Sequence, residues 1–292
     1  MVIYSHLQHT YEEVVVRQHI AFFWHRVWPL IILVVVLAAL MASLTACSPR
    51  HIARTASVTS TEAFQGGVLA TPLRVPAAKT YVPYNMFRGP NTTKRVALTY
   101  DDCPRTIAQF KTAITYAVAH DIGLAIFPTG DCVKSYRHRG FDLVTYARQR
   151  GVWVGNHSMS HPALTTLSSA SVKRQIGGVV KASVGRPPYG AINTRVKKVY
   201  ASLGMQPWLW NVDTNDWKGK SQSQIVTWVI KHARPSSTVL MHMQWHAFNP
   251  SAMRQIKQGL AARHLSLCRV WRGEDHVGAL EVTSAVFPKN IC

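Results

Sequence analysis

Acidic residues are scarce in this sequence. Its 292 residues include only 13 Asp and Glu against 33 Lys and Arg, so the formal net charge is +20. A protein this basic is expected to dwell on anionic surfaces, which outside a cell are acidic wall polymers and lipid headgroups. Nucleic acid is the other common partner, but the sequence contains no helix-turn-helix signature, zinc finger or other recognisable nucleic-acid-binding module. The charge therefore favours an anionic envelope surface over nucleic acid, unless it serves only to keep the protein soluble.

No Cys-x-x-Cys pair occurs among the 5 cysteines, which argues against a zinc site built from four cysteines. Cys47 stands apart from the others because it follows a long apolar run. If Cys47 carries a lipid, an even number remains, and an oxidising compartment would allow two disulfides. Four cysteines permit three pairings, which the sequence by itself does not distinguish; they are Cys103, Cys132, Cys268 and Cys292.

The long apolar run lies near the N-terminus. Residues 27–44 form a stretch of about 18 residues without charge, at the lower limit for a helix that spans a bilayer. The run ends in Leu-Thr-Ala-Cys at 44–47, which resembles a bacterial lipoprotein signal with Cys47 as the lipidated residue. The 26 residues before the run are long for a signal peptide, so an uncleaved single-pass anchor is the alternative. Either interpretation exports the chain and anchors it to the outer face of the cytoplasmic membrane.

Beyond this segment of 1–47, residues 48–92 are rich in Ser, Thr, Ala, Gly and Pro and are expected to form a tether. Short apolar runs then alternate with longer helical patterns, which predicts parallel βα units and one barrel-like α/β domain over 93–271. A tail over 272–292 follows. The expected strands cover 96–100, 124–127, 152–154, 207–212, 238–241 and 265–270, and the expected helices cover 105–120, 138–150, 168–182, 192–203, 222–233 and 250–263.

Residues suited to catalysis come directly after several of these strands: Asp101, His157, Asp213 and His242. In a barrel of this kind the carboxyl ends of the strands meet at one face, where the active site lies. We therefore expect these residues to share a site.

Two histidines have the spacing of metal ligands. His157 and His161 are four residues apart, so one helical turn would place both rings on the same face. No Glu lies between them, which excludes the zincin arrangement. Asp101 and Asp102 can supply a third ligand and a base, and such a set leaves positions open for water and substrate. The alternative is that the histidines only cap a helix and the acid pair only begins one.

Five stretches in this region, taken in order, resemble the motifs of polysaccharide deacetylases of the NodB-homology type, carbohydrate esterase family four. The resemblance extends over roughly 95–270. It implies a distorted (β/α) barrel that removes N-acetyl groups from sugars with zinc or another divalent ion. The stretches are Thr-Tyr-Asp-Asp-Cys-Pro (99–104), His-Ser-Met-Ser-His (157–161), Arg-Pro-Pro-Tyr-Gly (186–190), Asp-Thr-Asn-Asp-Trp (213–217) and Leu-Met-His (240–242).

The resemblance also implies a role for each matching position. Asp101 resembles the general base and Arg186 the residue that pairs with it. The three positions that resemble the metal ligands are Asp102, His157 and His161.

The other matching positions resemble the family's proton donor and pocket. His242 corresponds to the general acid and Asp216 to the acid that orients it. The backbone N–H of Tyr189 corresponds to the donor to the oxyanion. Trp217 and Leu240 correspond to the lining of the pocket for the acetyl group.

Three positions depart from the family pattern. Cys103 replaces a usual glycine beside the metal, and a Cys103–Cys132 disulfide at the same barrel end would hold its side chain back. The positions in the fold likewise favour a Cys268–Cys292 pair. The strand before the Arg-Pro-Pro-Tyr stretch is reduced to about 182–185, which puts barrel closure there in question. Met243 stands where a polar residue is common.

The sequence thus predicts a metal-dependent polysaccharide N-deacetylase outside the cytoplasm, acting on acetylated amino sugars such as peptidoglycan or a chitin-like polymer. Peptidoglycan is favoured only through location. One divalent ion is expected, with zinc first and cobalt or manganese also suited to the ligands. The alternatives are a sugar-binding homologue without turnover and a hydrolase of a non-sugar amide.

Overall fold

The computed structural model describes residues 83–178 and 180–292. The expected signal or anchor over 1–47, with its apolar run and Cys47, and most of the expected tether lie outside these residues. Across the described part of the chain, no helix combines the length and the apolar character needed to cross a membrane.

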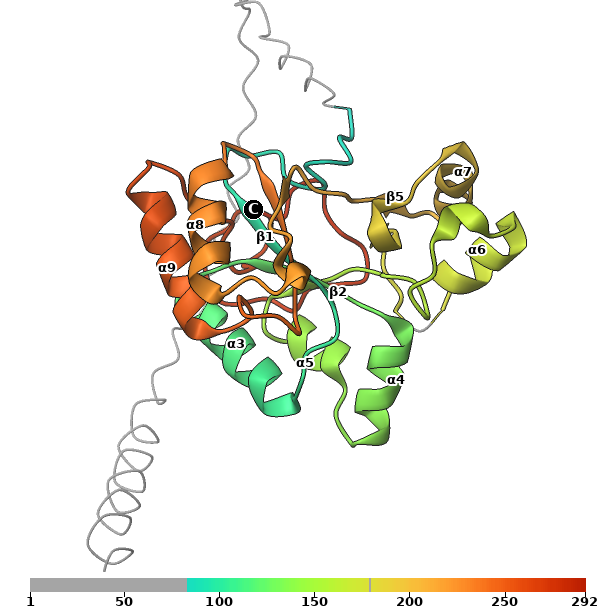
Figure 1. The fold of residues 1–292 in the computed structure, drawn as a ribbon, viewed down its shortest axis with the longest axis horizontal. Helices are drawn as coiled ribbons and strands as arrows, with labels where there is room; N and C mark the ends of the chain where they lie inside the picture. The colour runs from blue at the N-terminus through green and yellow to red at the C-terminus, as the bar shows by residue number, and fades with distance from the viewer. Residues whose placement is uncertain (1–82, 179) are drawn as a thin grey trace, which may run out of the picture. The chain divides into compact units, whose positions relative to one another are not determined.

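A parallel five-stranded sheet forms the centre of the fold, with strands in the order β3-β2-β1-β7-β6 (Figure 1). β1 is buried as far as Asp101, and all of β2 is buried. Strands covered on both faces require such continuous apolar runs, which is why these segments read as strands in the sequence. The bounds are β1 (Ala97–Asp102), β2 (Leu124–Pro128), β3 (Trp153–Val154), β6 (Val212–Asp213) and β7 (Thr238–His242).

Helices α3, α4, α5, α8 and α9 lie around this sheet, whereas α6 and α7 lie together to one side of it (Figure 1). α8, α9 and α3 contact one another in succession, α4 contacts α5, and α6 packs on α7. Each of these helices begins after a polar residue whose side chain accepts a hydrogen bond from a backbone N–H of the first turn. The bounds are α3 (Ile107–Ala119), α4 (Gly130–His138), α5 (Leu143–Arg148), α6 (Ser169–Ile176), α7 (Thr194–Ser202), α8 (Gln222–His232) and α9 (Pro250–Ala261).

A second, smaller sheet continues the first. β4 (Val184–Gly185) and β5 (Gln206–Pro207) pair in parallel. One bridge joins Gly185 of β4 to Asn156, which lies two residues after the end of β3. Among the described residues no ladder joins β5 to β6. The fold is therefore an α/β fold with parallel sheets in which the expected barrel stays open between β5 and β6.

Two expected strands differ from the structure. The strand expected over 207–212 is divided into β5 and β6, because the carbonyl groups of Trp208 and Leu209 accept hydrogen bonds from the Arg186 side chain instead of continuing a ladder. The strand expected over 265–270 contributes only one bridge, to the residue before β1.

The helix expected over 138–150 is also wrong in its extent. α4 already begins at Gly130, because Thr129 caps it, and the chain turns at Gly140 before α5. Gly140 has φ 74°, which favours glycine and ends the helix. The sequence pattern had merged the end of α4 with α5.

The segment 84–89 lies along the opening between β5 and β6. The carbonyl group of Met86 accepts a hydrogen bond of 2.7 Å from the backbone N–H of Leu209. Gly89 has φ 58°, and a Cβ at this position would lie 2.3 Å from the Trp208 indole. Only glycine allows this approach. The end of the expected tether thus packs directly on the domain.

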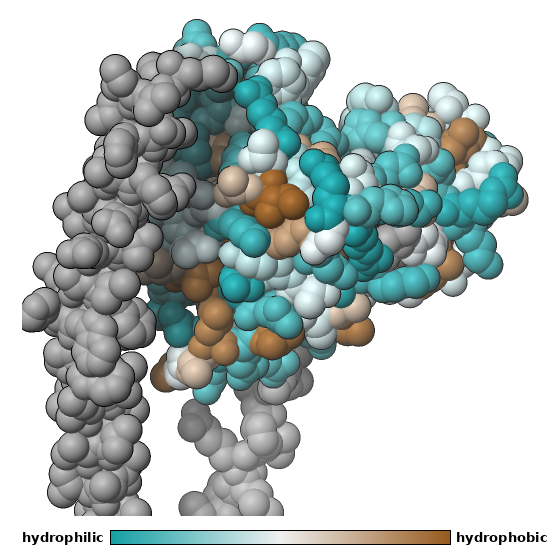
Figure 2. All heavy atoms as spheres, turned by 90° about the horizontal axis from the view of Figure 1, so that it is seen from below, coloured by the Kyte–Doolittle hydropathy of each residue, from teal (hydrophilic) through white to brown (hydrophobic). Residues whose placement is uncertain are grey.

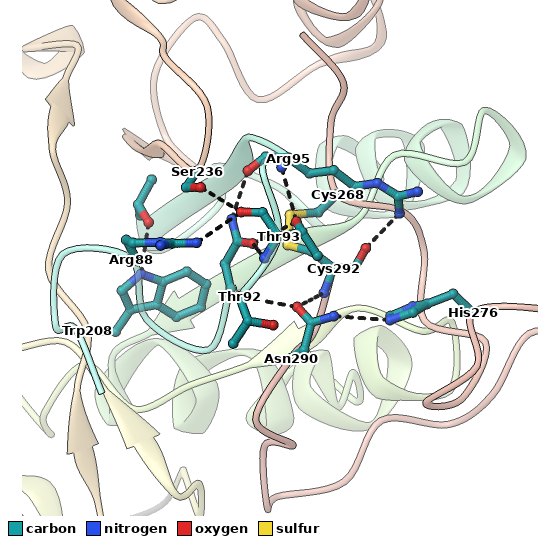
Figure 3. The surroundings of a disulfide bond; sticks show 12 residues. Arg88, Thr92, Thr93, Arg95, Trp208, Ser236, Cys268, His276, Asn290 and Cys292 are labelled. Carbon is teal, nitrogen blue, oxygen red and sulfur yellow. Dashed lines mark hydrogen bonds between the residues drawn. A yellow bond between two sulfur atoms is a disulfide. The ribbon is translucent and has the colours of Figure 1, made fainter. Parts of the chain in front are cut away.

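The tail over 272–292 contains no helix or strand but packs on the domain. A disulfide joins Cys268 to Cys292, and the Arg95 guanidinium donates a 2.6 Å hydrogen bond to the Cys292 carbonyl (Figure 3). Phe287 is buried in the same apolar cluster as this disulfide. The tail therefore closes the amino-terminal side of β1.

Candidate active site

The expected site residues converge at the carboxyl ends of the strands. Asp101 and Asp102 end β1, and His242 ends β7 directly opposite Asp101 in the sheet. His157 follows β3, and Arg186 follows β4. Because parallel strands present their carboxyl ends at one edge, five residues from distant parts of the chain meet there.

Asp102, His157 and His161 offer three ligand atoms that all lie within 4.8 Å of one another. Asp102 Oδ1 is 3.4 Å from Nε2 of each histidine. Two atoms that bind one zinc ion tetrahedrally at about 2.0–2.1 Å are about 3.4 Å apart, so the three residues fit a single divalent ion. His157 Nδ1 lies 2.8 Å from the Arg186 carbonyl oxygen, which leaves Nε2 for a metal, as is usual for a metal-binding histidine.

The pKa shifts of Asp102 and His161 also suit a bound cation. Burial and the neighbouring His157 lower the pKa of His161, which favours the neutral ring. Burial alone would raise the pKa of Asp102, but contacts with His157 and Gln244 hold that pKa well below its usual range. A carboxylate and neutral imidazoles are the forms that bind metal.

The two histidines lie in a loop after β3, so the prediction that they share a helical turn is wrong. Ser158 and His161 both have φ 61°, in the left-handed region, and the ring centroids of His157 and His161 are 4.9 Å apart. Gln175 of α6 fixes the loop, because its Oε1 accepts hydrogen bonds of 3.0 and 3.1 Å from two backbone N–H groups. No motif in the sequence pointed to Gln175.

Arg186 is fully buried and binds four acceptors. Its Nη1 donates hydrogen bonds of 2.8 Å to Asp101 Oδ1 and 2.9 Å to Thr99 Oγ1. Its Nε and Nη2 donate to the carbonyl groups of Trp208 and Leu209, at 2.9 and 3.2 Å respectively. A buried cation is stable only when it is paired and hydrogen-bonded in this way. Thr99, Trp208 and Leu209 are parts of the site that the sequence motifs did not identify.

Asp216 is buried and holds His242. Asp216 Oδ1 lies 2.7 Å from His242 Nδ1, and Oδ2 accepts a 2.8 Å hydrogen bond from the backbone N–H of His242. Burial alone would lower the pKa of His242, but the hydrogen bond to Asp216 and the charge of Asp101 raise it to about 9. The ring is therefore protonated at neutral pH. Asp213 supports the turn before Asp216, because its Oδ1 accepts a 2.8 Å hydrogen bond from the backbone N–H of Asn215.

The expected pocket residues differ in exposure. The Tyr189 side chain is 69% exposed and Trp217 is 52% exposed, whereas Leu240 in β7 is buried at 4%. The rings of Tyr189 and His161 meet edge to face with centroids 4.6 Å apart. Tyr189 thus lies against one candidate metal ligand, His161, and Leu240 is buried within β7.

Both favoured disulfides are present. Cys103, which directly follows Asp102, is joined to Cys132 in the first turn of α4, with 5.6 Å between the Cα atoms. The second pair is Cys268–Cys292. The first bridge attaches the end of β1 to α4 immediately beside the candidate ligands.

Comparison with known proteins matches this arrangement to one family. The family model described as polysaccharide deacetylase matches residues 88–208. The chain is 34% identical over 165 residues to the peptidoglycan-N-acetylglucosamine deacetylase PgdA of Listeria monocytogenes, a match that covers 52% of this chain and only 33% of that protein. It is 31% identical over 158 residues to a chitooligosaccharide deacetylase of Rhizobium leguminosarum bv. trifolii, covering 51% of this chain and 71% of that protein.

A solved structure shares the fold. The family 4 carbohydrate esterase from Streptomyces lividans in complex with acetate is 29% identical, with a TM-score of 0.51 over 60% of this chain and 91% of that chain.

Proposed function

Since this chain belongs to the polysaccharide deacetylase family, we propose that it removes N-acetyl groups from an extracytoplasmic polysaccharide, either peptidoglycan or a chitin-like polymer. Asp102, His157 and His161 would hold one divalent metal ion, with zinc the best match to their donor atoms and cobalt or manganese also suited. When bound, this ion would polarise the acetyl carbonyl group and make a neighbouring water more acidic.

Asp101 is the general base of the proposed reaction. It accepts a proton from water as the water oxygen bonds to the carbonyl carbon of the acetamido group. The buried guanidinium of Arg186 lies 2.8 Å from Asp101 Oδ1, and the second oxygen, Oδ2, lies 3.7 Å from His157 Nε2 in the site.

His242 is the general acid. Its proton passes to the sugar nitrogen as the C–N bond breaks, so acetate leaves and the sugar keeps a free amine. The backbone N–H of Tyr189 donates to the carbonyl oxygen as that oxygen gains charge, and Leu240 and Trp217 border the acetyl methyl group.

One observation carries this proposal: the two proton-transfer groups have partners of opposite charge. Asp101 pairs with a cation, and His242 pairs with the anion of Asp216 at 2.7 Å. A carboxylate beside a cation, opposite an imidazole beside an anion, is the arrangement that proton transfer in both directions requires.

The test is acetate release by metal-stripped protein to which zinc, cobalt or manganese is restored. Acetylated chitooligosaccharides and peptidoglycan fragments are supplied separately, to identify the polymer. Metal-dependent acetate release is the expected result. Binding of the sugars without acetate release would indicate a homologue without turnover. Hydrolysis confined to non-sugar amides would indicate the third alternative.

We also propose that residues 1–47 anchor the protein to the outer face of the membrane, through a lipid on Cys47 or a single span, with 48–92 as tether to the domain of 93–271 and its tail. The apolar run at 27–44 supports this assignment. Metabolic labelling with a fatty acid tests it, because Cys47→Ser should abolish labelling. An unlabelled wild type that keeps its N-terminus would favour the single span.

Anionic wall polymers or lipid headgroups are the proposed partners of the basic surface, and nucleic acid is not. The net charge of +20 supports this, and the face of the domain in Figure 2 is mostly hydrophilic. Binding to such polymers should weaken as salt concentration rises.

A further inference from the structure

We propose that Gln244 is a positioning residue that orients the carboxylate of Asp102 for metal binding. The inference rests on the metal site proposed above. Gln244 lies in the loop after β7, two residues beyond His242, and its Nε2 donates a 2.8 Å hydrogen bond to Asp102 Oδ2.

The two oxygens of the Asp102 carboxylate have different contacts. Oδ2 is held by Gln244, while Oδ1 lies 3.4 Å from Nε2 of both His157 and His161. Asp102 also has φ 69°, a left-handed conformation that is uncommon in residues other than glycine. A single short hydrogen bond on the outer oxygen fixes which oxygen faces the histidines.

The loop that carries Gln244 is itself fixed to the sheet. The backbone N–H of Met243 donates a 2.9 Å hydrogen bond to the carbonyl group of Asp101. The residue before Gln244 is therefore attached to the end of β1, next to Asp102. The Met243 side chain is buried, and the polar contact to Asp102 is made by the next residue, Gln244.

A purely space-filling role explains Gln244 less well. Among the described residues its Oε1 is buried and has no hydrogen-bond partner, which costs stability. Turning the amide over would face Oε1 toward the carboxylate, where two acceptors repel. The residue thus keeps one end unsatisfied while the other end binds Asp102, which points to the Asp102 contact as its function.

The test measures zinc binding by the metal-stripped protein, by calorimetry with zinc alone as the probe. Gln244→Met keeps the length of the side chain and removes the donor. Loss of a hydrogen bond behind a metal ligand weakens metal binding by roughly 10–100-fold, and this is the expected increase in the zinc Kd. The zinc concentration for half-maximal acetate release should rise by the same factor.

Gln109→Met is the matched control. It removes the 3.1 Å hydrogen bond that Gln109 of α3 donates to the Met243 carbonyl group, without removing any contact to Asp102. Its zinc Kd should therefore stay within about threefold of wild type. Thermal unfolding of the metal-free proteins shows whether each variant is folded, and Gln244→Ala gives the same comparison if methionine does not pack.

Equal zinc Kd values for wild type and the Gln244 variants would overturn the inference while leaving the metal site in place. Equal losses in the Gln109 and Gln244 variants would overturn it as well, because the loop rather than the Asp102 contact would be responsible. Wild-type protein that binds no divalent ion would overturn the proposed function and this inference together.

Discussion

Asp216 receives two hydrogen bonds from His242, one from the backbone N–H at 2.8 Å and one at the ring Nδ1 at 2.7 Å. The backbone contact fixes the end of β7, and the ring contact fixes the tautomer and raises the pKa of the imidazole. One buried carboxylate thus sets both the position and the charge of the proposed general acid.

The first prediction concerns the fall of kcat at high pH, the alkaline limb of the pH profile. The pKa of His242 is raised to about 9, so the ring carries its proton at neutral pH and loses it above that value. We expect kcat to fall as pH rises through about 9. In Asp216→Asn burial still lowers the pKa of His242, while the anion that raises it is gone, so the fall in kcat should move to lower pH. A pH profile of kcat with the limb unmoved in this variant would contradict the assignment of His242 as acid.

The second prediction concerns folding stability at alkaline pH. A histidine whose pKa is raised from 6.5 to about 9 on folding contributes stability that is complete below 6.5 and lost as pH rises through about 9. The difference in unfolding free energy between wild type and His242→Gln should therefore shrink over this window. Denaturant unfolding at several pH values measures it, and a constant difference would exclude the linkage.

The third prediction concerns the base. Asp101→Asn removes proton acceptance but leaves the three candidate ligands in place. Turnover should fall by roughly 10²–10⁴-fold, the usual contribution of a positioned base, while bound zinc is retained. Metal content and acetate release are measured on the same sample. Loss of metal in Asp101→Asn with retention in Asp102→Asn would mean that the two acids have exchanged roles.

The fourth prediction concerns the ligands. His157→Ala or His161→Ala should lose bound zinc and activity together, because each removes one of three protein ligands. His120→Ala, at the exposed end of α3, is the control and should change neither. Stoichiometric zinc with full turnover in either ligand variant would reject the site.

The fifth prediction separates the two disulfides. They join cysteines 29 and 24 residues apart, and each should stabilise the fold by about 3–4 kcal/mol in the chain-entropy model. Replacing both cysteines of either pair by serine should therefore lower the unfolding free energy similarly. Catalysis should suffer mainly in the Cys103/Cys132 variant, since that bridge adjoins Asp102. Equal kcat losses in both variants would show that the first bridge has no special link to the site.

Much of the central sheet was predictable because its strands have a physical signature. β1 and β7 are mostly apolar runs that lead into Asp101 and His242, and burial on both faces favours that composition. Because parallel strands end at the same edge of a sheet, these residues could be placed together from the sequence without information on side-chain packing. The cysteine pairing followed from the same placement.

Other parts of the site have no such signature. The carbonyl groups that hold Arg186 belong to Trp208 and Leu209, and every residue offers a carbonyl, so the sequence does not mark these two. The histidine loop depends on left-handed residues and on Gln175 from a later helix, whereas spacing alone suggested a helical turn. Tertiary contacts override local spacing in both places.

The segment 84–89 has a consequence for how far the folded domain could be shortened. Its Tyr84 hydroxyl donates 3.0 Å to the Pro207 carbonyl, and its Met86 carbonyl receives the N–H of Leu209. A shortened chain that began at residue 93 would keep every reacting side chain, yet it would uncover the peptide groups behind Arg186. The shortest chain that keeps these contacts behind Arg186 therefore begins before residue 93, ahead of the first recognisable motif.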